Sequence, residues 1–305
     1  MSFEIHPEDE RDRAVMLAMR DMLATLPALE FAPASRPVFE DLMQHTPVAD
    51  GISFETGTVG AVSGVWCRPM AGAARAAILY LHGGAYVLGS AIGHRNFVSQ
   101  IVQRAGAPAF IPDYRLAPEH GFPAAIDDAL SVFTGLCDMG YDATAIAGDS
   151  AGGGLALSLL ALVAARARKG AGVMPRCAVL MSPWIDLALA GGSMLTRAET
   201  DPLVKRDELK KAADLYLKGT DPTDPRASPL YQPLGGLPPL LVHVGDDEIL
   251  LDDSRRAVEA ASSAGGEAAL HIWEGMTHVF PSNLAQLQAA RQAIDMVGAF
   301  IRQHL

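Results

Sequence analysis

The segment from Ile146 to Gly154, IAGDSAGGG, sets one serine, Ser150, two residues from a glycine on each side. The residues before the serine, TAIAGDS, predict a buried strand, and AGGGLALSLLALVAARARKG after it predicts a helix. A Gly-x-Ser-x-Gly sequence between a strand and a helix is typical of a nucleophile elbow, where small neighbours permit a sharp turn. The alternative is an ordinary turn with Ser150 as the helix N-cap. We expect Ser150 to be a nucleophile.

A serine nucleophile needs a general base, and the base is a histidine in most such sites. Four histidines follow Ser150 in the chain: His243, His271, His278 and His304. The first two fall inside predicted strands, and the last lies in the tail. His278, in WEGMTHVF, follows a strand and precedes the final helix, so it is predicted in a loop at the sheet edge. We therefore expect His278 to be the base.

The tetrahedral intermediate of such a reaction needs hydrogen-bond donors for its anionic oxygen. The segment LYLHGGAY ends a predicted strand on His82, Gly83 and Gly84. Glycines let backbone N–H groups approach a ligand closely. We expect Gly83, Gly84 and Ala151 to form the oxyanion hole, and His82 to be a structural hydrogen-bonding residue.

The elements that must position these residues alternate along the chain. Apolar runs that end in glycine or turn residues predict strands, and segments with apolar residues at helical spacing separate them. The predicted strands include AAILYLHGG, APAFIPDY, RCAVLMSPW, PPLLVHVGDDE and AALHIWEG. Such alternation indicates an α/β fold with a mostly parallel sheet flanked by helices on both faces. SFETGTVGAVSGVWCRP instead predicts an antiparallel hairpin at the sheet edge.

Two segments depart from this alternation. Residues 1–45 predict N-terminal cap helices, one of them amphipathic with Val15, Met19, Met22 and Leu23 on one face. Residues 184–228 are polar and rich in turns. They predict either a cap insertion over the carboxyl edge of the sheet or plain surface decoration. Residues 46–183 and 229–305 then make the catalytic domain.

Composition narrows the class of protein. The 305 residues are 50% hydrophobic and carry a net charge of −11, which favours one large globular domain and argues against nucleic-acid binding. The three cysteines, Cys67, Cys137 and Cys177, form no CxxC pair. We expect no cofactor, no metal ion and no membrane span, and a cytoplasmic location. The sequence leaves open whether the chain forms a homodimer.

Six segments together resemble the bacterial hormone-sensitive lipase-like carboxylesterases of the α/β-hydrolase superfamily. They are LYLHGGAY, PDYRLAPEHGFPAAIDD, IAGDSAGG, SPWIDL, DPLV and WEGMTHVF, in that family's order. The resemblance covers roughly residues 75–300. It implies an α/β-hydrolase domain under a helical cap that cleaves short- to medium-chain acyl esters through an acyl-enzyme. It also implies the assignments of Ser150, His278 and the oxyanion donors made above.

The sequence departs from the family pattern at two places. Its glycine run has Ala85 at the position of the last glycine, which we expect to affect pocket shape. The triad acid of the family is usually an aspartate, but this chain has GDDEILLDD. Alignment without gaps places Glu248 there, 30 residues before His278. Glu248 is therefore the predicted acid, and Asp247 and Asp246 are its rivals.

Several further residues have weaker expectations attached to them. Arg115 and Glu119 are expected to form charge-assisted bonds behind the site, and Asp149 to fix the surroundings of the elbow. Asp186 and Asp201 are candidates for anchoring the cap. Candidate pocket walls, each of which could equally be core, are Tyr86, Trp184, Leu187 and Phe280.

Three functions remain open from the sequence. The first is a serine carboxylesterase that acts on a small-molecule ester. The second is an amidase, lactonase or deacetylase with the same triad. The third is a ligand-binding protein of the same fold, against which the presence of His278 argues.

Overall fold

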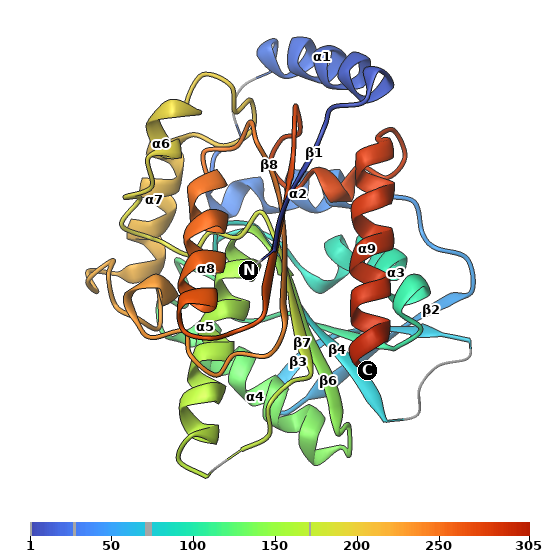
Figure 1. Cartoon of the computed structure of the whole chain (residues 1–305), viewed down its shortest axis with the longest axis vertical. Coiled ribbons are helices and arrows are strands. Elements are labelled where there is room, and N and C mark those ends of the chain that lie inside the picture. Colours follow the sequence, from blue (N-terminus) through green and yellow to red (C-terminus); the bar gives the residue numbers. More distant parts are fainter. Residues whose placement is uncertain (1, 27–28, 71–74, 171) are drawn as a thin grey trace.

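A nine-stranded sheet runs through the described part of the molecule in the order β1-β9-β8-β7-β6-β4-β5-β3-β2 (Figure 1). The computed structural model describes residues 2–26, 29–70, 75–170 and 172–305. Only the pairings of β3, with β2 and with β5, are antiparallel. The strands are β1 (Ser2–His6), β2 (Ile52–Val59), β3 (Val62–Pro69), β4 (Ala76–Leu81), β5 (Ala109–Pro112), β6 (Ala143–Asp149), β7 (Cys177–Met181), β8 (Leu240–Gly245) and β9 (Ala268–Trp273).

Helices cover both faces of this sheet, because side chains alternate along each strand. In β4, Ile78 and Tyr80 pack toward one face, whereas Leu79 and Leu81 pack toward the other. The first face is covered by α3 (Ala91–Ala105) and α9 (Gln288–His304), and the second by α4 (Ala124–Asp138), α5 (Ser150–Ala167) and α8 (Leu251–Ser263). The predicted mostly parallel sheet between helices is confirmed, and the predicted hairpin is β2 and β3 at one edge.

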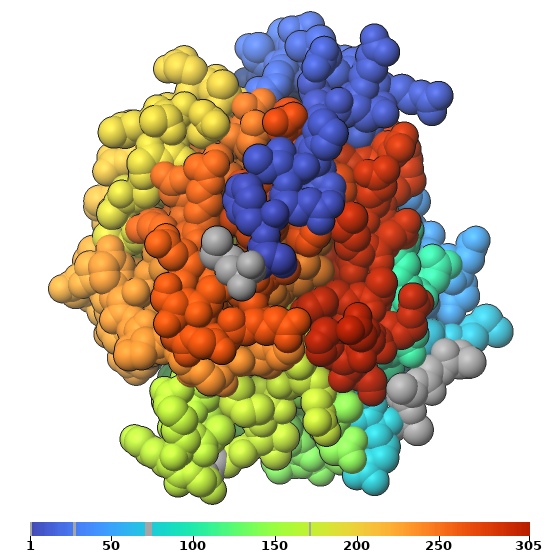
Figure 2. Space-filling view, viewed as in Figure 1, coloured from blue at the N-terminus to red at the C-terminus, as the bar shows by residue number. Residues whose placement is uncertain are grey.

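The opposite edge of the sheet corrects our expectation for the N-terminal segment. Residues 1–45 were expected to hold cap helices only, but Ser2–His6 form β1, which pairs in parallel with β9. Figure 2 shows this blue segment lying on the orange and red C-terminal part of the chain. The five residues SFEIH have mostly exposed side chains. Their alternation is too short and too weak to predict a strand.

The remaining helices are α1 (Glu10–Ala24) and α2 (Arg36–Met43), with the short α6 (Ser193–Thr196), α7 (Arg206–Leu217) and three 3₁₀ turns. The turns are η1 (Pro33–Ser35), η2 (Pro229–Tyr231) and η3 (Phe280–Ser282). The buried face of α1 is Asp12 and Met16, with Val15 and Met19 partly buried. Met22, predicted on that face, is 55% exposed, whereas the adjacent Leu23 is partly buried.

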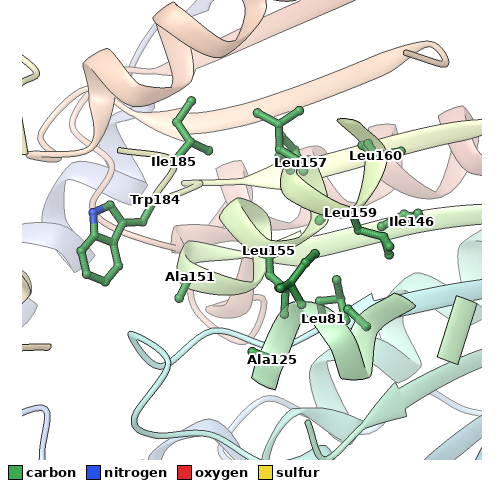
Figure 3. Close-up of a cluster of buried hydrophobic side chains, with 14 of the residues drawn as sticks. Leu81, Ala125, Ile146, Ala151, Leu155, Leu157, Leu159, Leu160, Trp184 and Ile185 are labelled. Atoms are coloured by element: carbon green, nitrogen blue, oxygen red, sulfur yellow. The ribbon is translucent and has the colours of Figure 1, made fainter. Parts of the chain in front are cut away.

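The helix α5 forms the centre of the core. Its residues Leu155 and Leu159 pack beside Leu81 of β4 and Ile146 of β6 (Figure 3). Among the described residues, α5 alone is long and apolar enough to cross a membrane, and 78% of it is buried inside the fold. A helix that is apolar on all sides is expected at such a buried position.

The segment 184–228 is tied to the loop that follows β8. Asp201 accepts hydrogen bonds from the N–H groups of Leu203 and Val204 and also from Ile249 N, at 3.0 Å. Asp186 accepts from Arg256 of α8 at 2.8 Å. Both aspartates are fully buried, and each one links the insertion to the α/β core, Asp201 through Ile249 N and Asp186 through Arg256.

Our first prediction concerns Asp12, which joins the first helix to the last. Its carboxylate accepts from the N–H groups of Gln288 and Ala289, both at 2.7 Å, at the start of α9. Asp12→Ala leaves these donors unsatisfied and should lower the free energy of unfolding by about 1–3 kcal/mol. Urea denaturation measures the change. Asp21→Ala, an exposed position on the same helix, is the control, and equal stability of the two variants would contradict this account.

Candidate active site

The topology of the sheet brings two loops together at its carboxyl edge. The neighbouring strands β4 and β6 lead into helices on opposite faces, α3 and α5. A crevice forms where adjacent parallel strands connect to opposite sides of a sheet, and ligands bind there in open α/β folds. His82–Ala85 follow β4, and Ser150 follows β6, so the predicted nucleophile and the predicted donors lie at this point.

The backbone of the turn at Ser150 explains why its neighbours are glycines. Ser150 has a φ of 51°, in the left-handed region that non-glycine residues rarely adopt. A Cβ on Gly152 would lie 2.0 Å from the carbonyl oxygen of Leu81, and one on Gly148 would lie 2.5 Å from Gly152 O. Larger residues at either position would force the turn open. The strained backbone therefore holds the Ser150 side chain at the start of α5.

Three side chains from different elements form a continuous hydrogen-bonded series. His278 Nε2 lies 2.9 Å from Ser150 Oγ, and His278 Nδ1 lies 2.9 Å from Glu248 Oε2. The residues come from the start of α5, the turn before α8 and the loop after β9. This is the arrangement in which a carboxylate orients an imidazole so that its other nitrogen can accept a proton.

The carboxylate of Glu248 is fully buried, and its second oxygen is also engaged. Glu248 Oε1 accepts hydrogen bonds from Ser182 Oγ and from Gly245 N, both at 2.7 Å. Ser182 Oγ in turn accepts from Val279 N, next to His278. Our sequence analysis did not single out Ser182, although it follows a predicted strand directly in the motif SPWIDL.

The two rival acids point elsewhere. Asp247 forms an ion pair with Arg20 of α1, and Asp246 Oδ1 accepts from Gly275 N at 2.7 Å. In the hydrogen bonds of the described residues, neither carboxylate is a partner of His278. The chain turns after Gly245, the last residue of β8, and this turn directs Asp247 and Glu248 to different surroundings.

Electrostatics at His278 favour its protonated form. Burial lowers the pKa of His278, but the hydrogen bond and charge of Glu248, with Asp201 and Asp149, outweigh it. The net result is a pKa above the ordinary value. The imidazole is therefore a stronger base than a free histidine, and its imidazolium form is stabilised in place.

The loop after β4 corrects one of the expected donors. The N–H of Gly83 donates to Asp149 Oδ1 at 3.0 Å, so it is not available to an oxyanion. The same oxygen accepts from Tyr80 OH at 2.7 Å. Within the described part of the chain, the N–H groups of Gly84 and Ala85 have no hydrogen-bond partner. Sequence spacing alone could not reveal that a buried aspartate engages the first glycine.

The positive φ angles of this loop fix its shape. Gly84 has a φ of 114°, and a Cβ there would lie 2.4 Å from Leu88 O. Ala85, where the family pattern has glycine, adopts a φ of 54°. His82 lies beneath the loop, with its Nδ1 2.8 Å from Gly83 O and its ring stacked on Tyr114. Burial lowers the pKa of His82 to about 4, so it remains neutral.

Aromatic residues enclose the region around the loop. Tyr216 of α7 stacks on Tyr86 with ring centroids 4.0 Å apart and an interplanar angle of 5°. The tyrosine from the insertion, which sequence analysis did not identify, thereby closes over the loop after β4. All four predicted wall residues are buried: Tyr86, Trp184, Leu187 and Phe280.

Arg115 and Glu119 both form charge-assisted hydrogen bonds, as expected, and their partners lie on two different helices. Arg115 binds Asp128 of α4 through both carboxylate oxygens, whereas Glu119 binds Arg36 of α2 at 2.7–2.9 Å. The two side chains diverge because their partners belong to helices on different sides of the loop. Glu119 thus ties the N-terminal segment to the loop that follows β5.

Comparisons with known proteins agree with this architecture. Residues 78–282 match the family described as alpha/beta hydrolase fold. An acetyl-hydrolase of Streptomyces hygroscopicus is 42% identical over 80% of this chain and 81% of its own length. An esterase of Acinetobacter venetianus is 35% identical over 92% and 93%. A crystal structure of an esterase from the bacterial hormone-sensitive lipase family has a TM-score of 0.89 and 37% identity, covering 97% of this chain and 99% of that one.

Our second prediction is that Glu248 sets the pKa of His278. Glu248→Gln removes the negative partner but leaves the burial, so the pKa of His278 should fall below its ordinary value of about 6.5. The imidazole would then lose its proton at a lower pH than in the wild type. NMR titration of the imidazole resonances measures this shift. Asp247→Asn is the matched control, and a larger shift in that variant would contradict the assignment.

Proposed function

Because this chain belongs to the alpha/beta-hydrolase family, among the bacterial hormone-sensitive lipase-like esterases, we propose that it cleaves short- to medium-chain acyl esters with Ser150, His278 and Glu248 as its triad. Its class is that of the carboxylic ester hydrolases. The observation that supports the triad is the unbroken series of contacts from Ser150 Oγ through both imidazole nitrogens to Glu248, each of 2.9 Å.

The reaction follows from these contacts. Ser150 Oγ attacks the ester carbonyl carbon while His278 Nε2 takes the hydroxyl proton, and Glu248 stabilises the imidazolium. The tetrahedral intermediate collapses as the imidazolium returns the proton to the departing alcohol, which leaves an acyl-Ser150. Water then attacks the acyl carbon with His278 as base. A second tetrahedral intermediate releases the carboxylic acid and restores the serine.

We place the oxyanion hole at Gly84, Ala85 and Ala151, in a change from the expected Gly83, Gly84 and Ala151. The first two N–H groups are unpartnered in the described structure, and Gly83 N–H is held by Asp149. Ala151 is the second residue of α5, where helical N–H groups have no partner within the helix. The partial positive charge of the helix terminus adds to their effect.

The segments 1–45, apart from β1, and 184–228 form a cap over this site in our proposal. Ser150 is only 8% exposed, and the stacked Tyr86 and Tyr216 restrict the space beside it. Buried rings held by stacking leave little room for a long acyl chain. The proposal therefore favours small acyl groups, and the known acetyl-hydrolase relative supports the same direction.

Our third prediction tests the triad by substitution. Ser150→Ala should lower kcat by at least ~10³-fold, and Glu248→Ala should also lower it by orders of magnitude. The reason is that the members of a catalytic triad work together, so the loss of any one of them removes most of the rate enhancement. Asp247→Ala, the adjacent control, should retain kcat close to the wild type. The measurement is hydrolysis of a chromogenic acetyl or butyryl ester, with circular dichroism to verify folding. An active Ser150→Ala enzyme would refute the mechanism, and an inactive Asp247→Ala with an active Glu248→Ala would move the acid by one residue.

Our fourth prediction concerns chain length. In a series of p-nitrophenyl esters from acetyl to palmitoyl, kcat/KM should be highest for acyl groups up to about eight carbons and fall beyond them, because a buried aromatic wall cannot take up longer chains. Tyr216→Ala should shift the optimum toward longer chains, whereas Tyr231→Ala, at a partly exposed tyrosine outside this stack, should not. Activity that keeps rising through palmitoyl esters would contradict the proposed cap.

A further inference from the structure

A second group of chemically competent side chains lies at the β1 edge of the sheet, outside the hydrolytic site. Glu4 and His6 are alternate residues of β1, so they share one face, and the parallel register sets Glu4 opposite His271 of β9. One ligand atom from each of the three residues lies within 4.8 Å of the others. Figure 2 shows the N-terminal segment that carries two of them at the molecular surface.

The two imidazoles are held in place by their neighbours. His6 Nε2 lies 2.8 Å from His271 Nδ1, and the His6 ring stacks on Trp273 with centroids 3.9 Å apart and an angle of 13°. His271 also stacks on the buried ring of His243, at 5.0 Å. Stacking on both sides means that little side-chain entropy remains to be lost when a ligand binds these rings.

The three residues differ in solvent exposure and in charge, and both properties affect how they could bind a ligand. The side chains of His6 and His271 are 13% and 15% exposed, whereas that of Glu4 is 61% exposed. The Glu4 carboxylate lies 3.6 Å from His271 Nδ1 and 3.9 Å from His6 Nδ1. Burial lowers the pKa of both histidines, which favours the neutral imidazole, and a neutral imidazole keeps a lone pair on one nitrogen.

Two neutral imidazoles and one carboxylate, open to solvent on one side, are the donors that zinc and its neighbours in the first transition row prefer. We propose that Glu4, His6 and His271 bind a divalent ion of this class, with Zn²⁺ as its representative, and that water completes the coordination. The imidazole N–H shared between the two rings moves to the other nitrogen of its own ring, a tautomer exchange through solvent that leaves one lone pair on each ring for the metal.

A metal ion bound at this site would hold β1 against β9. The ligands come from both strands, and only Pro7, Glu8 and Asp9 separate β1 from α1. Since Arg20 of α1 pairs with Asp247, beside Glu248, the ion would also steady the helix that rests near the hydrolytic site. The simpler alternative is that the two histidines only share a hydrogen bond and bind no metal.

The experiment titrates ZnCl₂ into the full chain, freed of metal by a chelator, and follows binding by isothermal titration calorimetry. One equivalent should bind saturably. Glu4→Gln, at an exposed position that should not disturb folding, should weaken the affinity by at least ~10-fold, because even the loss of an outer-shell partner typically has an effect of this size at metal sites. Glu55→Gln is the matched control, because Glu55 is an equally exposed glutamate on β2 at the far edge of the sheet.

Two further measurements test whether zinc binds at Glu4, His6 and His271 and not elsewhere. His278→Gln should leave the zinc affinity unchanged, since it removes the other histidine–glutamate pair. Zinc should slow amide hydrogen exchange in residues 2–6 of the wild type and not of Glu4→Gln. Absence of saturable binding, equal affinities for Glu4→Gln and Glu55→Gln, or loss of binding in His278→Gln would each overturn the proposal.

Discussion

The buried carboxylate of Glu248 is the constraint on which the arrangement of this site depends. A charge with no exposure is tolerated only where donors surround it, because the interior cannot replace the water it loses. Here the donors are Ser182 Oγ, Gly245 N and the imidazole of His278. They come from the ends of three neighbouring strands, β7, β8 and β9. The requirement to satisfy one carboxylate thus fixes the relative positions of three loops.

A second buried carboxylate, on the other side of Ser150, also holds several partners. Asp149, directly before the serine, holds Tyr80 and the backbone of Gly83 through one oxygen atom. It couples the turn after β6 to the loop after β4, so one buried side chain fixes the proposed nucleophile and the proposed donors to one another. In a comparable way, the buried Asp186 and Asp201 tie the segment 184–228 to the α/β core.

Local sequence patterns were sufficient to predict those parts of the fold that depend on residues close together in the chain. Buried strands that end in glycine, and a helix that begins at Ser150, predicted the sheet and the position of the elbow. The predicted loop position selected His278, and alignment with the family motif selected Glu248; the structure places their side chains 2.9 Å apart. What could not be predicted depends on long-range contacts. Examples are the five-residue β1, the engagement of Gly83 by Asp149, and the meeting of Glu4 with His271, since no sequence motif joins residues so far apart.

The parallel pairing of β1 with β9 has a consequence for the order in which the chain folds. Ser2 lies opposite Ala269, so the chain must be synthesised as far as β9 before β1 can find its partner. Contacts between such distant segments close large loops and form slowly. As the ribosome releases the chain, the first strand and α1 must wait while the central strands assemble. We expect the N-terminal segment to be the last to join the fold, which leaves the edge of β9 unpaired until then.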